Sequence, residues 1–257
     1  MSEQASERAL VDEVHALLRE GEEDSLRIFL RLVRPEDIAG WLDLLDVEDR
    51  QRILAALDHE TAGRVLDDTT VSIRAELVEE LDPERLARIA ETMPADEAAD
   101  LIGELEVADS EQVLRHIDDE DERVLRHLLR FPEDTAGGIM NPEVVALEPT
   151  ATVDDAIAHL RSIGPDTVTA SLYVVDATRR LLGFVRLRRL VTAPPSAQLG
   201  HIMSSDVITV RVDADQEEVA DLVDKYDFMA VPVVDSEGRL LGAVTVDDVL
   251  EIGRAHV

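Results

Sequence analysis

The chain has 257 residues, of which 45% are apolar, so it is long enough for two domains and can bury a substantial core. Its 57 acidic and 25 basic residues give a net charge of -32, which disfavours binding to nucleic acid or to anionic membrane surfaces. Because cysteine is absent, disulfides and thiolate metal sites are excluded. No apolar run approaches the roughly 20 residues of a membrane span, and no signal peptide opens the chain. We therefore expect a soluble, intracellular protein that does not insert into a membrane.

Residues 33 to 126 follow a twelve-residue period. The ninth position of each period is always apolar: Trp41, Ile53, Val65, Leu77, Ile89, Leu101, Val113 and Leu125. Each period also begins with residues that favour a helix start, as in Asp82-Pro83-Glu84. Because helices this short are unstable alone in water, the pattern predicts eight short helices stacked into a solenoid.

Four further residues are expected to cap these helices through their side chains: Asp46, Asp58, Thr70 and Asp118. The stretch from Glu7 to Glu20 predicts one more amphipathic helix, which would cover the beginning of the stack. The residues of the predicted solenoid include no pattern that is typical of a catalytic site. Asp96 and Asp100 are spaced by one helical turn, so their carboxylates face one side of a helix. On this spacing alone, a solvated acidic face is favoured over a cation site.

A polar, glycine-rich joint at residues 133–138 is followed by a segment that occurs twice. Leu172-Tyr-Val-Val-Asp176 and Leu181-Leu-Gly183 align with Val231-Pro-Val-Val-Asp235 and Leu240-Leu-Gly242 at a constant offset of 59 residues. Each repeat predicts a buried strand, a turn, a second strand and a short helix. Upstream, Ile139-Met-Asn-Pro recurs as Ile202-Met-Ser-Ser, each before a strand and an acidic amphipathic helix, at residues 152–160 and 214–224.

These residues, together with Gly242-Ala-Val-Thr-Val-Asp-Asp248, resemble a tandem pair of CBS domains over about residues 139–252. The resemblance implies two β-α-β-β-α folds that pack sheet to sheet, dimerise through the pair and often bind adenosine nucleotides or metals. It implies nucleotide contacts for Thr245 and Asp248, with Phe228 and Arg188 as further candidates. In the first repeat, Arg186 and Arg189 stand at the positions of Thr245 and Asp248. Arginines can bind phosphate, but this repeat lacks the carboxylate that would bind ribose.

The order of an acidic solenoid, Glu133-Asp-Thr-Ala-Gly-Gly-Ile-Met140 and a CBS pair resembles the cytosolic region of MgtE-type magnesium transporters over nearly the whole chain. Asp215-Gln-Glu-Glu-Val-Ala and Asp224-Lys-Tyr-Asp-Phe228 are also similar to that family. The resemblance implies Mg²⁺ bound between the solenoid, called the N domain, and the CBS pair. It implies metal ligands at Asp96, Asp100, Asp227 and Asp248, followed by Asp247, Glu217 and the carbonyl of Gly138.

The resulting expectation is an α+β multidomain chain with an all-α N domain at residues 1–132, the joint at 133–138, and CBS repeats at 139–193 and 194–257. Its expected function is Mg²⁺ sensing for a transporter, with Mg²⁺ as ligand and ATP or another adenosine nucleotide as a further one. Arg64 departs from the family pattern, because it stands where relatives carry an acidic residue, and it is expected to pair with a carboxylate. No pore segment is present, which fits either a part of a transporter or a free-standing relative.

Two other functions remain open from the sequence. The first is a nucleotide-sensing CBS protein in which the solenoid is a docking arm. The second is a salt-adapted scaffold whose acidity serves solvation, in keeping with a chain in which Lys225 is the only lysine. An enzyme is not expected, because no nucleophile–base pair, phosphate-binding loop or metal-hydrolase motif occurs.

Overall fold

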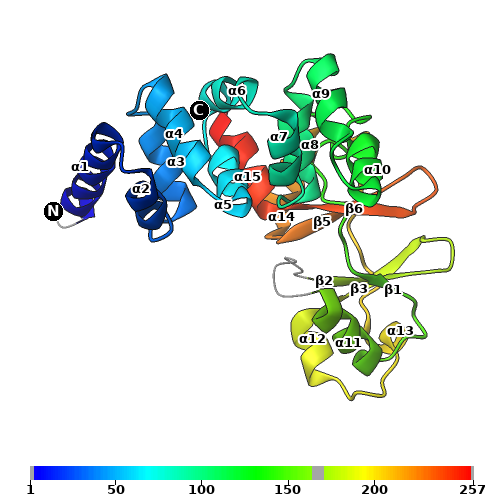
Figure 1. Cartoon of the computed structure of the whole chain (residues 1–257). Helices are drawn as coiled ribbons and strands as arrows, with labels where there is room; N and C mark the ends of the chain where they lie inside the picture. Colours follow the sequence, from blue (N-terminus) through cyan, green and yellow to red (C-terminus); the bar gives the residue numbers. More distant parts are fainter. Residues whose placement is uncertain (1–2, 164–170, 256–257) are drawn as a thin grey trace. The chain divides into compact units, whose positions relative to one another are not determined.

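The computed structural model describes residues 3–163 and 171–255, and side chains from residue 10 to residue 250 outside that gap. The chain divides into two compact units, residues 1–123 and 124–257, and each is described by itself. The first unit is helical, and the second contains two three-stranded sheets with their helices (Figure 1). This architecture confirms the expected α+β chain with an N-terminal helical solenoid.

The solenoid consists of short helices whose first residues recur every twelve positions from α3 onwards. The helices are α3 (Pro35–Leu42), α4 (Val47–Ala56), α5 (His59–Asp67), α6 (Val71–Glu79), α7 (Pro83–Ala90), α8 (Ala95–Gly103), α9 (Val107–Leu114) and α10 (Asp119–Leu128), the last of which crosses the boundary between the units. The predicted series of eight short helices with a twelve-residue period is therefore confirmed.

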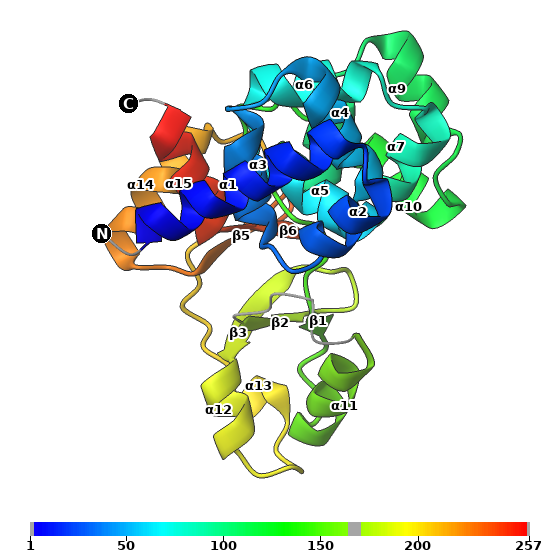
Figure 2. The same ribbon diagram turned by 60° about the vertical axis from the view of Figure 1, so that its left-hand side comes forward.

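Two helices precede this series, namely α1 (Glu3–Glu20) and α2 (Glu23–Leu30). The sequence predicted only part of α1 and did not predict α2. Alternate helices pack on one another: α2 on α4 and α4 on α6 in one row, and α3 on α5, α5 on α7 and α7 on α9 in the other (Figure 2). The apolar residue at the ninth position of every period is buried, with 0% to 3% of its surface exposed.

Three of the expected aspartate caps form. The side chains of Asp46, Asp58 and Asp82 accept hydrogen bonds from the backbone N–H groups of Asp49, Thr61 and Glu84, at 3.0, 2.9 and 2.9 Å. The hydrogen bonds from Thr61 lower the pKa of Asp58, because they stabilise the charged carboxylate that forms the cap. The expectation for Thr70 is wrong, because its side chain makes no capping bond at the start of α6.

Arginine side chains link helices within the solenoid. The guanidinium groups of Arg50, Arg52 and Arg85 donate to backbone carbonyls of Leu42, Leu18 and Leu54, at 2.7, 2.7 and 2.6 Å. Each acceptor lies in the last turn of a helix, where carbonyl groups have no partner within the helix. A planar, multi-donor cation suits this task, which gives several of the arginines a structural role.

The second unit contains two copies of one β-α-β-β-α arrangement. The first has β1 (Ala146–Leu147), α11 (Val153–Ile163), β2 (Ser171–Val175), β3 (Leu181–Arg186) and α12 (Leu187–Thr192). The second has β4 (Val210–Arg211), α14 (Gln216–Tyr226), β5 (Ala230–Val234), β6 (Leu240–Thr245) and α15 (Val246–Ala255). A short helix, α13 (Leu199–Ile202), which the sequence did not predict, precedes β4 in the second repeat.

The strand registers confirm the duplication. In each sheet the first two strands are parallel and the last two antiparallel, and the pairs Ser171–Arg186 and Ala230–Thr245 occupy equivalent positions. Apolar residues from both sheets, including Tyr173 from the first and Leu240 from the second, pack into one cluster. The expectation that the two sheets pack together is therefore met within this unit.

The segments that lead into the two repeats are exchanged between them. Asn141, which precedes β1 of the first repeat, shares two 2.9 Å backbone hydrogen bonds with Ala243 on β6 of the second. Ser204, which precedes β4 of the second repeat, shares bonds of 2.9 and 3.0 Å with Phe184 on β3 of the first. Glycine is required beside each crossing. A Cβ atom on Gly183 would lie 2.6 Å from the carbonyl oxygen of Ser204, and one on Gly242 would lie 2.5 Å from that of Asn141.

Candidate functional site

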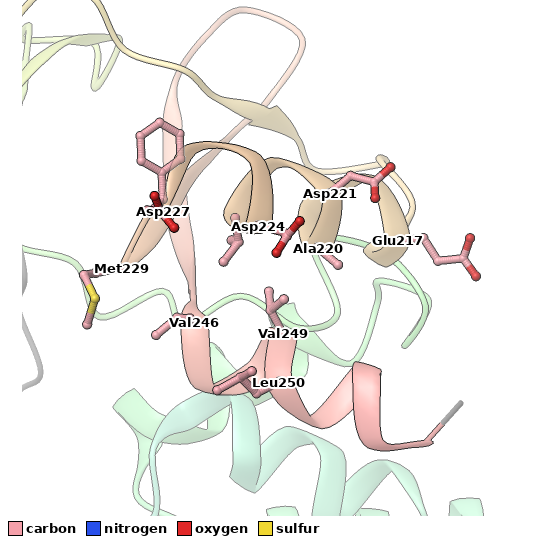
Figure 3. Close-up of a pocket in the computed structure, with 11 residues that line it drawn as sticks. Glu217, Ala220, Asp221, Asp224, Asp227, Met229, Val246, Val249 and Leu250 are labelled. Atoms are coloured by element: carbon pink, nitrogen blue, oxygen red, sulfur yellow. The ribbon is translucent and has the colours of Figure 1, made fainter. Parts of the chain in front are cut away.

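A groove of 740 Å³ lies between α14 and α15 in the second repeat. The two helices pack side by side, and the groove ends at the segment that joins α14 to β5. Its apolar lining includes Val246, Val249 and Leu250 on α15, opposite the acidic residues of α14 (Figure 3). Met229 and Leu250 are 64% and 60% exposed, so part of this apolar lining is open to solvent.

The acidic side of the groove is a stripe on α14. Glu217, Asp221 and Asp224 are spaced four and three residues apart, so they share one helix face, and all three are exposed. Glu217 was a candidate from the sequence, whereas Asp221 and Asp224 were not. The four- and three-residue spacing from Glu217 was the signal that could have identified them.

Asp227 stands at the end of this stripe, immediately after α14. It adopts the left-handed conformation with φ of 53°, and its backbone N–H donates to the carbonyl of Val223, which terminates the helix. This turn places Asp227 and Phe228 in the groove lining with Glu217. The rings of Tyr226 and Phe228 stack with centroids 5.3 Å apart. Three sequence candidates, Glu217, Asp227 and Phe228, therefore line one surface.

Thr245 and Asp248 are engaged with each other at the start of α15. The Asp248 carboxylate accepts hydrogen bonds from the Thr245 backbone N–H at 2.9 Å and from its Oγ1 at 2.6 Å. Burial raises the pKa of Asp248, the two hydrogen bonds from Thr245 oppose the rise, and the charge of Asp247 adds to it. The pair is thus a helix-capping arrangement, and a ligand that contacted it would meet an ordered carboxylate. Asp247 itself is exposed.

The equivalent position in the first repeat has different chemistry. Arg186 is the cap residue of α12 without a side-chain capping bond, and its guanidinium lies 5.7 Å from the centroid of the Phe184 ring. Arg188 and Arg189 are exposed on α12. The two repeats consequently present arginines and aspartates at matching places, as the sequence indicated.

In the first unit, the Asp96 and Asp100 candidates lie on α8. Asp96 is 7% exposed, Asp100 is exposed, and both carboxylates have interaction partners. Burial of Arg74 disfavours its charge, but the hydrogen bond and charge of Glu104, with smaller contributions from Asp67 and Asp100, raise the pKa of Arg74 overall. An arginine therefore offsets part of the negative charge around Asp100.

Two other sequence expectations concern single positions. Arg64 pairs with Glu60 on α5 at 3.0 Å, which confirms that it binds a carboxylate. Gly138 is buried in the joint, where its N–H donates to the Thr135 carbonyl at 2.9 Å. A Cβ atom at Gly138 would collide with the carbonyl oxygen of Pro132, so the tight joint requires glycine here.

Among the side chains that the structure describes, in residues 10–163 and 171–250, no three His, Cys, Asp or Glu side chains are grouped so that they could hold a metal ion. Of the candidate ligands, Glu217 and Asp227 line the groove, Asp247 and Asp248 belong to the first turn of α15, Gly138 is in the joint, and Asp96 and Asp100 are on α8. In the same described part of the chain, no helix is long and apolar enough to cross a membrane.

Models of two known domain families match the chain. Residues 33–134 match the MgtE intracellular N domain, and residues 136–196 and 199–254 match the CBS domain. The magnesium transporter MgtE of Thermus thermophilus is 41% identical over 97% of this chain and 56% of its own length. MgtE of Bacillus subtilis is 27% identical over 95% of the chain and 54% of its own length. The chain thus spans about half the length of these curated relatives.

Solved structures agree over the whole fold. A crystal structure of the cytosolic domain of the Mg²⁺ channel MgtE in complex with ATP is 37% identical, with a TM-score of 0.89, over 94% of this chain and 99% of that one. The soluble part of a magnesium transporter is 27% identical with a TM-score of 0.84, over 98% and 99% of the two chains. Inosine-5'-monophosphate dehydrogenase of Nitrosopumilus maritimus matches only 44% of the chain, at 25% identity.

Proposed function

Because this chain belongs to the MgtE family and corresponds to its cytosolic N domain and CBS pair, we propose that it senses Mg²⁺ and regulates a magnesium transporter. The family is one of transporters and not of enzymes, and the dehydrogenase likeness covers less than half of the chain. The observation that most supports the proposal is the acidic stripe of α14 with Asp227, which is exposed to solvent in a chain of net charge -32.

In the proposed mechanism, Mg²⁺ binding changes how the two units are arranged relative to each other. Without metal, carboxylates on both units repel each other. Mg²⁺ is a hard cation that binds oxygen and retains several waters, so carboxylates on two facing surfaces can share it without forming a closed cage. We assign this role first to Asp96 and Asp100 on α8 and to Asp227 and Asp248 in the second repeat. Asp247, Glu217 and the carbonyl of Gly138 are secondary candidates.

Bound Mg²⁺ would neutralise the repulsion and increase the population of a compact arrangement. The compact arrangement would report to a pore that magnesium is abundant. This coupling needs only a difference in Mg²⁺ affinity between the two arrangements, and it does not require a preformed site.

A thermal melt separates specific Mg²⁺ binding from general salt adaptation. We expect MgCl₂ to raise the melting temperature more than NaCl of equal ionic strength. A ligand at about ten times its Kd stabilises the folded state by about 1.4 kcal/mol per site, which corresponds to about 3–6 °C here. Equal stabilisation by the two salts would instead support a scaffold whose acidity only serves solvation.

A second candidate function is adenosine-nucleotide binding by the CBS pair. It is favoured by the ordered Thr245–Asp248 pair at the start of α15 and by the similar MgtE cytosolic domain that was solved with ATP. Phe228 and Arg188 would supply a stacking surface and a phosphate contact. The first repeat has Arg189 where the second has Asp248, so it lacks this carboxylate. The difference argues against an equivalent nucleotide site in the first repeat.

Calorimetric titration with ATP and AMP, each with and without Mg²⁺, tests this candidate. Asp248→Asn should weaken nucleotide binding at least tenfold, because a charge-assisted bond worth about 1.5–3 kcal/mol is lost while the amide oxygen can still cap α15. Glu237→Gln, on the exposed β5–β6 turn, is the matched control and should bind as the parent does. Absence of binding heat for both nucleotides would eliminate this function.

We also propose that the chain forms a homodimer through its CBS pair, as the family resemblance implies. The exposed apolar residues of the second unit, such as Val191 and Leu250, support an additional protein contact.

A further inference from the structure

Two arginines occupy equivalent positions in the solenoid. Arg50 on α4 and Arg74 on α6 are each the fourth residue of their helix and lie two twelve-residue periods apart. Arg50 donates from Nε to the carbonyl of Leu42, the last residue of α3, at 2.7 Å, and from Nη1 to Glu76 at 3.0 Å. An arginine at this position therefore links neighbouring helices, mainly through a short bond to a helix end.

Arg74 makes different use of the same position. Its Nε and Nη2 both donate to the carboxylate of Glu104, the first residue after α8, with Nε 3.0 Å from Oε2. Its bond to a helix end, from Nη1 to the carbonyl of Asp67, is 3.5 Å long and therefore weak. The side chains of Arg74 and Glu104 are 16% and 25% exposed. The bidentate pair fixes the guanidinium, so Arg74 contributes mainly a positive charge at the end of α8.

Helix α8 concentrates negative charge on one face. Asp96, Asp100 and Glu104 are spaced four residues apart, a spacing at which like charges repel. The helix has no basic residue in its last turn, where a cation would be favourable. Burial disfavours the charge of Arg74, but the hydrogen bond and charge of Glu104, with smaller contributions that include Asp100, raise the pKa of Arg74. An arginine from α6 thus supplies the cation that α8 lacks.

We propose that Arg74 is a built-in counter-cation of α8 and raises the Mg²⁺ concentration at which Asp96 and Asp100 bind the metal. This inference rests on the proposed Mg²⁺ sensing and adds a residue that sets its threshold. A guanidinium and a metal ion near the same carboxylates repel each other, so each lowers the affinity of the carboxylates for the other. Ligand charge is one of the factors that tune the affinity of a divalent-cation site, and Arg74 reduces the effective charge without removing a ligand.

The expected size of the effect follows from Coulomb's law. In water at low salt, a unit charge about 8–15 Å from a divalent cation changes the affinity for that cation by roughly two- to sixfold. Because a guanidinium stays protonated wherever carboxylates are ionised, the opposing charge of Arg74 does not vary with pH. A sensor with such a fixed charge stays free of metal at low Mg²⁺ and binds it only when Mg²⁺ is abundant.

Calorimetric titration of the whole chain with MgCl₂ in about 20 mM NaCl tests the proposal, with circular dichroism to verify that each variant is folded. Arg74→Gln should bind Mg²⁺ roughly two- to sixfold more tightly than the parent, and Arg74→Met, a second way to remove the charge, should do the same. Arg74→Lys keeps the charge and should bind as the parent does. Arg50→Gln is the matched control, because its partners are on α3 and α6 and not on α8. It should also keep the parental Kd.

The direction of the change separates an electrostatic role of Arg74 from a structural one, since loss of a structural contact would weaken Mg²⁺ binding. Raising NaCl to about 0.5 M should bring the Kd values of Arg74→Gln and the parent together, because salt screens a charge that acts through space. Parental or weaker binding by folded Arg74→Gln, or equal tightening in Arg50→Gln, would overturn the proposal and leave Mg²⁺ sensing intact. A parent that binds no Mg²⁺ would contradict Mg²⁺ sensing itself, and the role of Arg74 with it.

Discussion

Replacing Gly242 by alanine should lower the stability of the second unit by about 3 kcal/mol, because the added methyl group meets backbone and not a movable side chain. Its Cβ would lie 2.5 Å from the carbonyl oxygen of Asn141. That oxygen accepts the hydrogen bond from the Ala243 N–H, so the exchanged lead segment would have to move away from β6. Gly183→Ala should have a similar effect through Ser204, since the two crossings are equivalent.

Differential scanning calorimetry measures the effect, and a drop in melting temperature of about 6–12 °C is expected for Gly242→Ala. Gly40→Ala is the matched control, because a Cβ at this position in α3 would meet nothing within 4 Å. Alanine in a helix is favoured over glycine by about 0.5–1 kcal/mol, so this control should melt at or above the parental temperature. A Gly242→Ala protein that melts with the parent would contradict the exchanged-segment account.

The second large effect concerns the response to Mg²⁺. Asp96→Ala and Asp227→Ala should each abolish most of the Mg²⁺-dependent rise in melting temperature, because a metal shared between two surfaces loses affinity when either contributes one ligand fewer. Asp96 is 7% exposed, so its replacement is also expected to change the melting temperature without metal. The informative quantity is therefore the difference between melts with Mg²⁺ and with EDTA for each variant.

Asp43→Ala provides the control for the removal of one carboxylate. Asp43 is exposed at the end of α3, and no metal role is assigned to it. It should retain the full Mg²⁺-dependent rise. If Asp96→Ala responded normally and only Asp227→Ala did not, the metal would be bound by the second unit alone, and the proposed sharing would be wrong.

The regular parts of the fold could be predicted because each depends on a local pattern. The buried ninth position determined the helix spacing of the solenoid, and the offset of 59 residues determined the two repeats. Helix α2 begins at Glu23, twelve residues before α3, so it continues the series, but it was not predicted because Gly21 stands where most other periods begin with an apolar residue. The exchange of lead segments could not be predicted either. Nothing in Ile139-Met-Asn-Pro indicates that Asn141 pairs with β6 of the other repeat and not with its own.

The candidate site was predictable only in part. The resemblance identified Glu217, Asp227 and Phe228, and the structure places these three in one groove lining. It did not reveal Asp221 and Asp224, because acidic residues are too frequent in this chain for a single one to stand out. Nor could it show that Asp248 is already engaged by Thr245, or that Arg74 is charged beside Asp100, because both depend on side-chain geometry.

The central claim is that Mg²⁺ draws the two units together, and small-angle X-ray scattering of the whole chain tests it most directly. Scattering would be recorded in EDTA with NaCl and in about 10 mM MgCl₂ at the same ionic strength, a concentration chosen to exceed a Kd in the millimolar range. The account predicts a smaller radius of gyration in Mg²⁺ for the parent, and no change for Asp227→Ala. An identical radius of gyration of the parent in the two solutions would contradict it.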